Sequence, residues 1–356
     1  MKEKELTFPQ ITPAPGGHLF SWPDQEIYIK LEYLREHHDS ITAELWAEQG
    51  ASREHLIGGL TYNLKTPGGR ASMVKALTAR RNGVDWGGMM EQVCVYALQK
   101  FREQEALTTI GNLPTRSDLS FRLGPVLPEG VTTMLFGYGG SAKTTIAKLW
   151  GLLIQTGEPR LGLTPKEGPV LDLDWETDRE IANHTQQALH AGMRLSGDPL
   201  FLYRRCRRPL LEFIEQVKAD VEREGVVLTI ADSLAYACGS ERELKENAIP
   251  TLTALAQLGT VLLINHRPKG EEGKSRGSYG SVYAENAVRQ SFRVEARADP
   301  KEPQMDIVLF HSKHNLMSLL HPIGYRITFD KLLGTEVKLQ DVGEVPDIRN
   351  QQDAVF

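Results

Sequence analysis

The stretch that most constrains the fold is TMLFGYGGSAKTTIAKLW, residues 133–150. An apolar run leads into three glycines within four positions, and a lysine, two threonines and a further apolar run follow. This order predicts a buried strand, a tight turn and a helix. Backbone N–H groups of glycines can converge on an anion without interference from a Cβ atom, and the first turn of a helix carries partial positive charge. The stretch therefore predicts a phosphate-binding loop.

Two side chains at the start of the helix would do the chemistry of such a loop. Lys143 would reach the β and γ phosphates of a bound nucleotide, and Thr144 would ligate Mg²⁺. The other residues expected to contact the nucleotide are Gly137, Tyr138, Gly139, Gly140, Ser141, Ala142 and Thr145. A glycine-rich turn with an exposed lysine is the alternative interpretation, and the strand–turn–helix context favours the nucleotide.

Ala142 departs from the usual G-x-x-x-x-G-K-[ST] pattern, which has glycine directly before the lysine. Alanine is the best helix former, so it fits if the backbone at this position is already right-handed. If φ must be positive, alanine costs about 1 kcal/mol or more. We expect weakened nucleotide binding at worst.

From residue 131 onward, short apolar runs alternate with amphipathic stretches, which predicts a parallel sheet with helices on both faces. The expected strands are 131–136, 169–175, 200–205, 226–231 and 260–265, and the expected helices are 143–156, 178–192, 210–223 and 242–257. The final third reads as further strands, added antiparallel. We assign this domain to residues 131–340 and a C-terminal tail to 341–356.

The chain before residue 131 has a different pattern. Three alternating runs and two helical patterns predict a small antiparallel sheet with two helices between residues 18 and 107, preceded by a loose lead-in over residues 1–17. The expected strands are 26–34, 41–48 and 55–64, and the expected helices are 69–82 and 85–107. We therefore predict an α+β domain over residues 1–110, joined by a linker over 111–130.

Acidic residues follow two of the expected parallel strands. Asp232 ends the run VVLTIAD, where a carboxylate can support the Mg²⁺ shell; a strand-ending or helix-capping aspartate is the alternative. Glu176 follows the strand that contains LDLDW, where it could orient and deprotonate the attacking water. Asp174 is a weaker candidate for the same role, because it lies inside the strand.

A histidine and a basic loop follow the strand at 260–265. His266 could contact the γ phosphate and report its loss to the next loop, or could simply cap the strand. The loop 267–280 contains Lys269, Lys274 and Arg276, which could contact a nucleic-acid backbone. A solvated surface loop is an equally good interpretation of this composition.

The ordered set of motifs resembles the RecA-type ATPases, and within them the RepA-like hexameric helicases and related phage and plasmid ATPases. The motifs are the phosphate loop, LDWE, ADS, NH, SRGS, NAVRQ and HSKHN, over about residues 115–330. The resemblance implies a RecA-like domain that hydrolyses ATP with Mg²⁺. It implies that Glu176 activates water, that Asp232 supports the metal ion and that His266 senses the γ phosphate.

The resemblance also implies a homo-oligomer, typically a hexamer, that acts on single-stranded DNA in replication or mobile-element maintenance. In such rings a neighbouring subunit inserts a cation into each site, and Arg289 and Lys313 are the candidates here. Each could equally be a solvated surface residue. Residues 1–110 have no counterpart in the minimal helicase core, and they could bind a protein partner, DNA or a neighbouring subunit.

A second basic cluster has no place in this set of motifs. The segment LYRRCRRPL holds Arg204, Arg205, Arg207 and Arg208, which could face nucleic acid or a subunit interface. In a strand these side chains would be divided between the two faces, so that at most a pair would act together. A role in DNA binding is the less favoured interpretation.

Composition excludes several classes of protein. The net charge of −5 over 356 residues argues against a uniformly basic nucleic-acid binder but leaves room for a local basic groove. No apolar run reaches the roughly 18 residues that a membrane span needs, so we expect no membrane insertion. The three cysteines are widely spaced with no C-x-x-C pair, which indicates neither a disulfide framework nor a zinc site and fits a reducing cytoplasm.

Two other functions remain open beside a DNA-translocating ATPase. The chain could be an ATP-gated assembly or recruitment protein that does not unwind DNA. Because of Ala142, it could also be a structural relative that no longer binds ATP.

Overall fold

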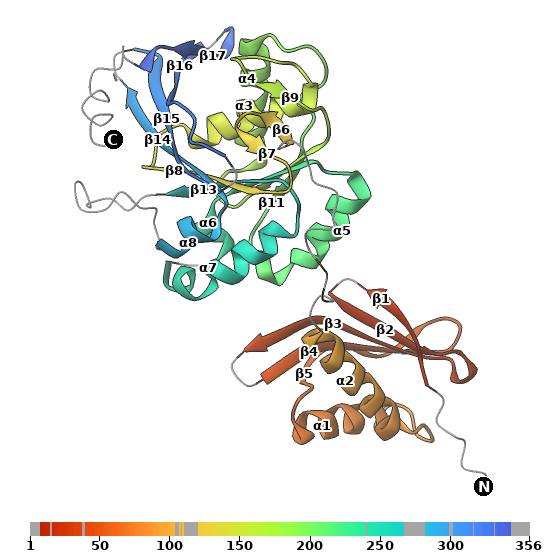
Figure 1. Ribbon diagram of the computed structural model, residues 1–356. Coiled ribbons are helices and arrows are strands. Elements are labelled where there is room, and N and C mark those ends of the chain that lie inside the picture. Colours follow the sequence, from red (N-terminus) through yellow and green to blue (C-terminus); the bar gives the residue numbers. More distant parts are fainter. Residues whose placement is uncertain are drawn as a thin grey trace. The chain divides into compact units, whose positions relative to one another are not determined.

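The computed structural model describes residues 8–14, 16–37, 40–103, 107, 109, 120–239, 241–266, 282–298, 302–315, 317–330 and 332–342. The chain forms two compact units, Met1–Thr115 and Arg116–Phe356 (Figure 1). Each unit has its own apolar core, so each is described separately.

The N-terminal unit is an antiparallel five-stranded sheet covered on one face by two helices (Figure 1). The strands run in sequence order across the sheet and are β1 (Gln10–Ala14), β2 (Gly17–Trp22), β3 (Ile27–His37), β4 (Ser40–Gln49) and β5 (Glu54–Asn63). The helices are α1 (Pro67–Thr78) and α2 (Trp86–Arg102). Alternate residues of β4 are fully buried beneath these helices, as the period of two predicts.

The predicted α+β fold of this unit is confirmed, but its first two strands were not expected. We predict residues 1–17 as a loose lead-in, and β1 lies within them. Pro13 in β1 is compatible with a strand only because β1 is the outermost strand of the sheet, where one side makes no ladder hydrogen bonds. Sequence patterns penalise proline without knowing which strand lies at the edge.

The second unit is built on a nine-stranded sheet with the order β11-β10-β12-β13-β8-β14-β15-β16-β17. The first six strands in this order are mutually parallel, and the last three are added antiparallel. The strands are β8 (Thr132–Gly137), β10 (Val170–Asp174), β11 (Leu202–Arg205), β12 (Leu228–Asp232), β13 (Val261–His266), β14 (Gln290–Ala298), β15 (Gln304–His314), β16 (Ile323–Asp330) and β17 (Gly334–Gln340).

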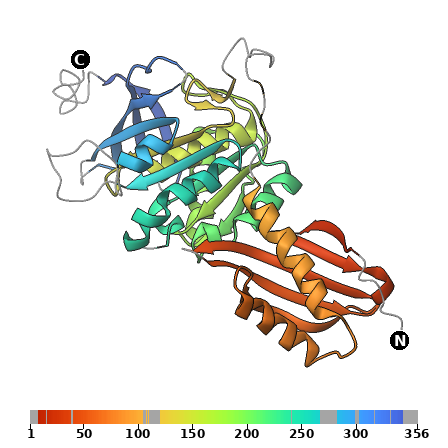
Figure 2. The same cartoon turned by 60° about the horizontal axis from the view of Figure 1, so that its bottom comes forward.

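Helices cover both faces of this sheet, as the alternating pattern predicts (Figures 1 and 2). One face packs against α3 (Lys143–Thr156) and α4 (Arg179–Met193). The other packs against η2 (Leu210–Glu212), α5 (Ile214–Glu224), α6 (Leu234–Ala237), α7 (Glu241–Ala256) and α8 (Val282–Ala287). The central strands are buried from both sides; every residue of β8, β10 and β12 is buried.

Two details of this unit differ from the expected elements. β14 pairs parallel to β8, and only β15, β16 and β17 are antiparallel additions. Within the segment assigned to a linker, residues 111–130, β6 (Phe121–Gly124) and β7 (Leu127–Pro128) form a small separate sheet with β9 (Thr164–Pro165). Leu123, Val126 and Leu127 in this segment belong to the core of the second unit.

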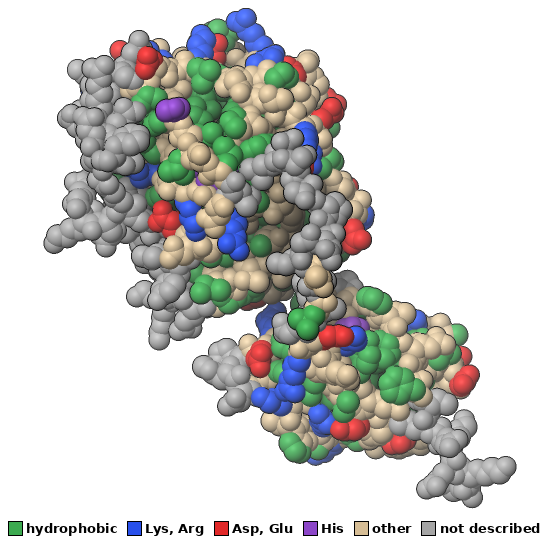
Figure 3. Space-filling model, in the orientation of Figure 1, with side chains coloured by type: hydrophobic (Ala, Val, Ile, Leu, Met, Phe, Trp, Pro, Cys, Tyr) green, Lys and Arg blue, Asp and Glu red, His purple; other side chains and the backbone are tan. Residues whose placement is uncertain are grey.

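The surface carries charges of both signs. On the face shown in Figure 3, acidic and basic side chains are interspersed over both units, in keeping with the small net charge of −5. Among the helices that the structure describes, none combines the length and the apolar character required to cross a bilayer.

Candidate nucleotide-binding and hydrolysis site

The glycine-rich loop connects β8 to α3 and is shaped by steric limits at its glycines. A Cβ atom at Gly137 would stand 2.4 Å from the carbonyl oxygen of Val294 on β14, so the strand must end in glycine. At Gly139 and Gly140 a Cβ atom would meet nothing within 4 Å, and the φ angle of Gly140 is +79°. The loop is therefore open on the side where phosphates are expected to bind.

Ala142 adopts the conformation that the sequence analysis identifies as unfavourable for alanine. Its φ and ψ angles are 60° and 21°, in the left-handed region, and it is the residue directly before α3. Such a backbone costs a residue with a Cβ atom about 1 kcal/mol. The Ala142 methyl group packs against the apolar core beneath α3, which offsets part of this cost.

Lys143 is buried inside the loop. Its ammonium group donates hydrogen bonds to the carbonyl oxygens of Gly137 and Tyr138, at 3.1 and 2.7 Å, and to Ser141 Oγ at 3.3 Å. Burial lowers the pKa of Lys143 to about 8, against the opposing effect of Asp232 and Glu176. The cation is thus held within the loop that the phosphates would approach.

Thr144 and Asp232 form the predicted metal-binding pair. Thr144 Oγ1 donates to Asp232 Oδ2 at 2.6 Å, which joins the first turn of α3 to the end of β12. Burial raises the pKa of Asp232 to about 7, while the bond from Thr144 lowers it and nearby carboxylates raise it further. A hydroxyl oxygen and a carboxylate oxygen side by side are hard donors of the kind that Mg²⁺ accepts, so the residues fit this ion.

Glu176 lies in the turn between β10 and α4, and Asp174 holds that turn in place. Asp174 Oδ1 accepts hydrogen bonds from the backbone N–H groups of Glu176 and Thr177, at 2.8 and 2.7 Å. This role, together with its near-complete burial, makes Asp174 a structural residue. The Glu176 carboxylate is left free of the turn and projects toward Asp232.

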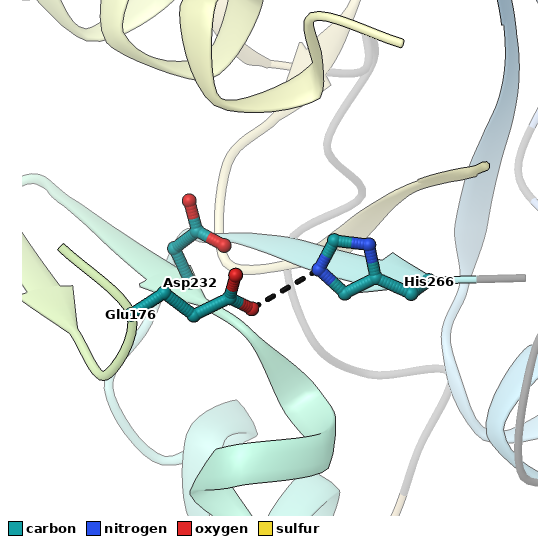
Figure 4. Close-up of side chains that lie close together, drawn as sticks. All are labelled: Glu176, Asp232 and His266. Carbon is teal, nitrogen blue, oxygen red and sulfur yellow. Dashed lines mark hydrogen bonds and ion pairs between the residues drawn. The ribbon is translucent and has the colours of Figure 1, made fainter. Parts of the chain in front are cut away.

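Three side chains surround the space between these elements (Figure 4). Glu176 Oε1 accepts a hydrogen bond from Ser233 Oγ at 2.5 Å and lies 3.0 Å from His266 Nε2. Glu176, Asp232 and His266 each offer one atom that could ligate a metal ion, and these three atoms lie within 4.8 Å of one another. The bond from His266 is the main cause that lowers the pKa of Glu176, so this carboxyl group is ionised at neutral pH.

The three clustered residues could in principle hold a metal ion among themselves. His266 Nε2 is already engaged by Glu176, and imidazole is a ligand that suits zinc or iron better than Mg²⁺. The Thr144–Asp232 pair therefore remains the better candidate for magnesium, and His266 is better placed to orient Glu176.

These residues come together because they follow neighbouring parallel strands. β8, β10, β12 and β13 end at one edge of the sheet. The loop with Lys143 follows β8 and Glu176 follows β10, while Asp232 and His266 are the last residues of β12 and β13. The carboxyl ends of parallel strands form the ligand-binding edge of open α/β sheets. The sequence analysis assigned no role to Ser233, although the motif ADS contains it. The feature that could have indicated a role is a hydroxyl side chain directly after the aspartate that ends the strand.

Arg289 and Lys313, the two residues expected to enter the site of a neighbouring subunit, lie apart from the site of their own chain. Lys313, on β15, donates to the carbonyl oxygens of Glu285 and Asn286 at 2.9 Å, at the C-terminal end of α8. Arg289 is exposed and is close enough to lower the pKa of Lys313, after the larger effect of burial. Among the described contacts, neither reaches the loop, Asp232 or Glu176.

The remaining predicted residues are quickly placed. Thr145 is half-buried in the first turn of α3. The nucleic-acid candidates Lys269, Lys274 and Arg276 lie outside the described residues.

Comparison with known families agrees with this geometry. Residues 100–272 match a family model described as an AAA domain. This segment of the chain is thus similar to AAA domains. The matched segment contains the glycine-rich loop, Glu176, Asp232 and His266, so the similarity agrees with the nucleotide-binding interpretation of the loop.

A search of curated proteins found no relative of significant similarity. Among solved structures, a KaiC-like protein from the hyperthermophilic archaeon Pyrococcus horikoshii OT3 resembles this chain with a TM-score of 0.41 and 17% sequence identity. The alignment covers 59% of this chain and 90% of that protein. Nothing about the function of this chain follows from so distant a likeness.

Proposed function

We propose that this chain is a RecA-like ATP hydrolase that works as a ring of identical subunits, of the RepA-like type, on single-stranded DNA in replication or mobile-element maintenance. The observation that supports hydrolysis is the convergence of Lys143, Thr144, Asp232 and Glu176 at one edge of the sheet. The ring, the DNA substrate and the cellular task rest on the resemblance of the ordered motifs.

The described side chains divide the work of hydrolysis between them. Lys143 and the backbone of the glycine-rich loop hold the β and γ phosphates and offset their charge. Glu176 takes a proton from the water whose oxygen bonds to the γ phosphorus, while the bond from that phosphorus to the β–γ bridging oxygen breaks and leaves ADP and phosphate. When bound by Thr144 and Asp232, Mg²⁺ would supply Lewis-acid stabilisation of the phosphate oxygens.

Ser233 and His266 position the base. Both bond to Glu176 Oε1, so they fix the carboxylate and leave Oε2 for the water. His266 is the last residue of β13, which pairs directly with the phosphate-loop strand β8. Loss of the γ phosphate would therefore change the contacts of His266, which is the sensing role that the resemblance implies.

Completion of the site by a neighbour is consistent with the placement of Arg289 and Lys313. Arg289 directly precedes β14 and Lys313 belongs to β15, on the far side of β8 from β12 and β10. Among the described contacts, neither side chain reaches Glu176, Asp232 or His266 of its own chain. In a ring, the same residues of the next subunit could enter the site. An arginine in that position would stabilise charge in the transition state.

The test of hydrolysis is the Glu176→Gln variant. A side chain of the same shape that cannot take a proton should lower the ATP turnover number by about 100-fold or more, while ATP binding measured by calorimetry persists. Glu180→Gln, which alters an exposed glutamate in the first turn of α4, is the matched control and should turn over ATP normally. Unchanged turnover in the Glu176 variant would refute the assignment.

An ATP-gated assembly or recruitment protein is the alternative, because residues 1–110 have no counterpart in the minimal core. A strand-displacement assay separates the two. ATP turnover that releases no strand from any forked DNA favours the assembly protein, whereas ATP-dependent release favours the motor.

A further inference from the structure

A cavity of about 440 Å³ opens beside the end of β11, at the same edge of the sheet as the catalytic cluster. Arginine and aromatic side chains dominate its lining, which includes Trp175, Asp178, Arg205, Arg207, Arg208 and Tyr236. Neither the phosphate loop nor any residue of the hydrolysis mechanism lines it. The cavity thus offers a binding site distinct from the nucleotide site.

The backbone explains why three arginines meet here. β11 ends at Arg205, so only the side chains of Arg204 and Arg205 are divided between the two faces of the sheet. Arg204 pairs with Asp220 on α5, away from the cavity. Arg207 and Arg208 follow the strand and turn toward the same cavity as Arg205, which corrects the expectation that at most a pair would act together.

The three guanidinium groups are not neutralised to the same degree. Arg205 lies 3.9 Å from a carboxylate oxygen of Asp174 and 3.7 Å from one of Asp178. Arg208 has one distant partner, Glu212 at 3.7 Å, and its side chain is 66% exposed. Arg207 is exposed and makes no ion pair or hydrogen bond with any described residue. The cavity therefore presents unsatisfied positive charge on a surface of otherwise mixed sign.

Two aromatic rings complete the cavity. Trp175 is almost fully buried, and its indole N–H donates to the carbonyl oxygen of Arg208 at 2.8 Å, which fixes the arginine loop above it. Tyr236, on α6, is 54% exposed, and its ring lines the cavity. An exposed ring beside exposed guanidinium groups matches the two parts of a nucleotide unit, a flat base and a phosphodiester.

We propose that this cavity binds one or two nucleotides of single-stranded DNA, with Arg207 and Arg208 on the phosphates and Tyr236 stacked on a base. The proposal rests on the proposed function, because it supplies that function with a DNA contact among the described residues. Planar guanidinium groups recognise phosphate oxygens through paired hydrogen bonds, and stacking is indifferent to base identity, so the contact would not depend on sequence.

The walls of the cavity are continuous with the catalytic cluster. Trp175 immediately precedes Glu176, and its backbone N–H donates to the carbonyl oxygen of Asp232 at 2.8 Å. Tyr236 lies three residues after Ser233, which bonds to Glu176. A strand that displaces either ring would move the segments that hold the base and the metal-binding aspartate, so DNA bound here would change the rate of hydrolysis.

The experiment compares variants of the full-length chain by fluorescence anisotropy with a labelled oligothymidylate. The Arg207→Ala/Arg208→Ala variant should bind about tenfold or more weakly at moderate salt, and its slope of log affinity against log salt should fall by about 1.4, because two phosphate contacts are lost. Lys218→Ala/Arg223→Ala removes the same charge from α5 outside the cavity and should leave affinity and slope nearly unchanged.

The aromatic contact has its own pair of variants. Tyr236→Leu should weaken binding about fivefold or more with no change in the salt slope, and Tyr236→Phe, which keeps the ring, should bind like the original chain. Stimulation of ATP turnover by the oligonucleotide should fall in parallel with affinity in the arginine and leucine variants.

Three outcomes would overturn the site. The first is normal binding of oligothymidylate by the arginine variants. The second is competition by thymidine monophosphate or inorganic phosphate that is as strong as competition by the oligonucleotide, because that would indicate a site for a single phosphate. Loss of particle mass with normal DNA affinity would indicate a subunit contact. ATP turnover of the unaltered chain without DNA is measured separately, because its absence contradicts the proposed function whatever the arginine variants show.

Discussion

Ala142 is the residue at which sequence and conformation conflict most directly. A left-handed backbone favours glycine, so Ala142→Gly relieves strain but also removes a methyl group that packs on the core. We expect the free energy of unfolding to stay within about 1 kcal/mol of the original and to shift toward higher stability. Ala142→Val should instead lose about 2 kcal/mol or more, because a β-branched side chain tolerates positive φ poorly. Urea unfolding of both variants measures the two values, and equal stability of all three chains would contradict the strain.

The burial of His311 makes the free energy of unfolding depend on pH. Its ring stacks on Phe292 with centroids 4.4 Å apart, and Nδ1 accepts a hydrogen bond from the backbone N–H of Leu320 at 2.9 Å. Burial lowers the pKa of His311 to about 4, with a further contribution from His314. Because the folded pKa lies below the ordinary value near 6.5, stability from the neutral ring is complete above pH 6.5 and is lost as the pH falls toward 4.

The variant that isolates this effect is His311→Gln, which keeps an acceptor but does not titrate in this range. Between pH 7 and pH 5 the original chain should lose about 1–2 kcal/mol more of its free energy of unfolding than the variant does, after allowance for partial solvent screening. Urea unfolding at the two pH values gives the difference. Parallel losses in both chains would show that His311 does not titrate as its burial requires.

The sequence predicts the identity of most site residues because each follows an apolar strand. Lys143, Thr144, Glu176, Asp232 and His266 could all be named in this way, since parallel strands bring their carboxyl ends to one edge. The sequence could not decide the φ angle of Ala142, because that depends on the approach of β14 and α3 to the loop. Nor could it separate Asp174 from Glu176 by role, because the turn that Asp174 holds exists only once β10 and α4 are packed.

At the scale of elements, a buried ion pair joins the phosphate-loop helix α3 to β10, the strand that precedes Glu176. Lys148 of α3 and Asp172 of β10 are 2.9 Å apart, and both side chains are almost fully buried. Burial raises the pKa of Asp172, and Lys148 opposes that effect. Lys148→Met would leave the aspartate buried without its partner.

We expect Lys148→Met to cost about 3–5 kcal/mol of unfolding free energy, and the Lys148→Met/Asp172→Leu double variant to recover most of that loss. Lys218→Met, which breaks the half-buried Lys218–Glu215 pair on the surface of α5, should cost less than about 1 kcal/mol and serves as the control. Urea unfolding of the three variants decides the matter, and a double variant no more stable than the single one would show that the pair contributes more than charge compensation.

Elements with a strong period were predicted closely, and those set by tertiary context were not. Residues 143–156 were expected to form one helix and form α3 over the same bounds, because apolar residues recur along a helix opened by the glycine turn. The four-residue α6 and the two-residue β7 and β9 are too short to show any period. β7 and β9 form by pairing with β6, and α6 buries Leu234 and Ala237 against the core of the second unit.

At the scale of the whole molecule, two separate cores mean that the N-terminal unit and the second unit can be tested apart. The first unit buries Phe20, Trp22 and Trp86 within its own sheet and helices, and no residue of the second unit belongs to that core. Fragment 1–115 should therefore unfold cooperatively by itself, with a transition that the fragment 116–356 lacks. Circular dichroism during thermal unfolding of each fragment and of the full chain makes the comparison.

Assembly is the prediction that belongs to the complete chain. If Arg289 and Lys313 complete the site of a neighbour, the contact that forms the ring lies within the second unit, and ATP at the interface should strengthen it. The mass of the full-length particle should then rise to a multiple of the protomer, six in a RepA-like ring, when ATP and single-stranded DNA are added. Fragment 116–356 should assemble in the same way, whereas failure of that fragment alone would assign the subunit contact to residues 1–115. A full-length chain that keeps the mass of one protomer under all conditions, measured by light scattering with Glu176→Gln included to prevent turnover, would contradict the ring and with it the role of Arg289 and Lys313.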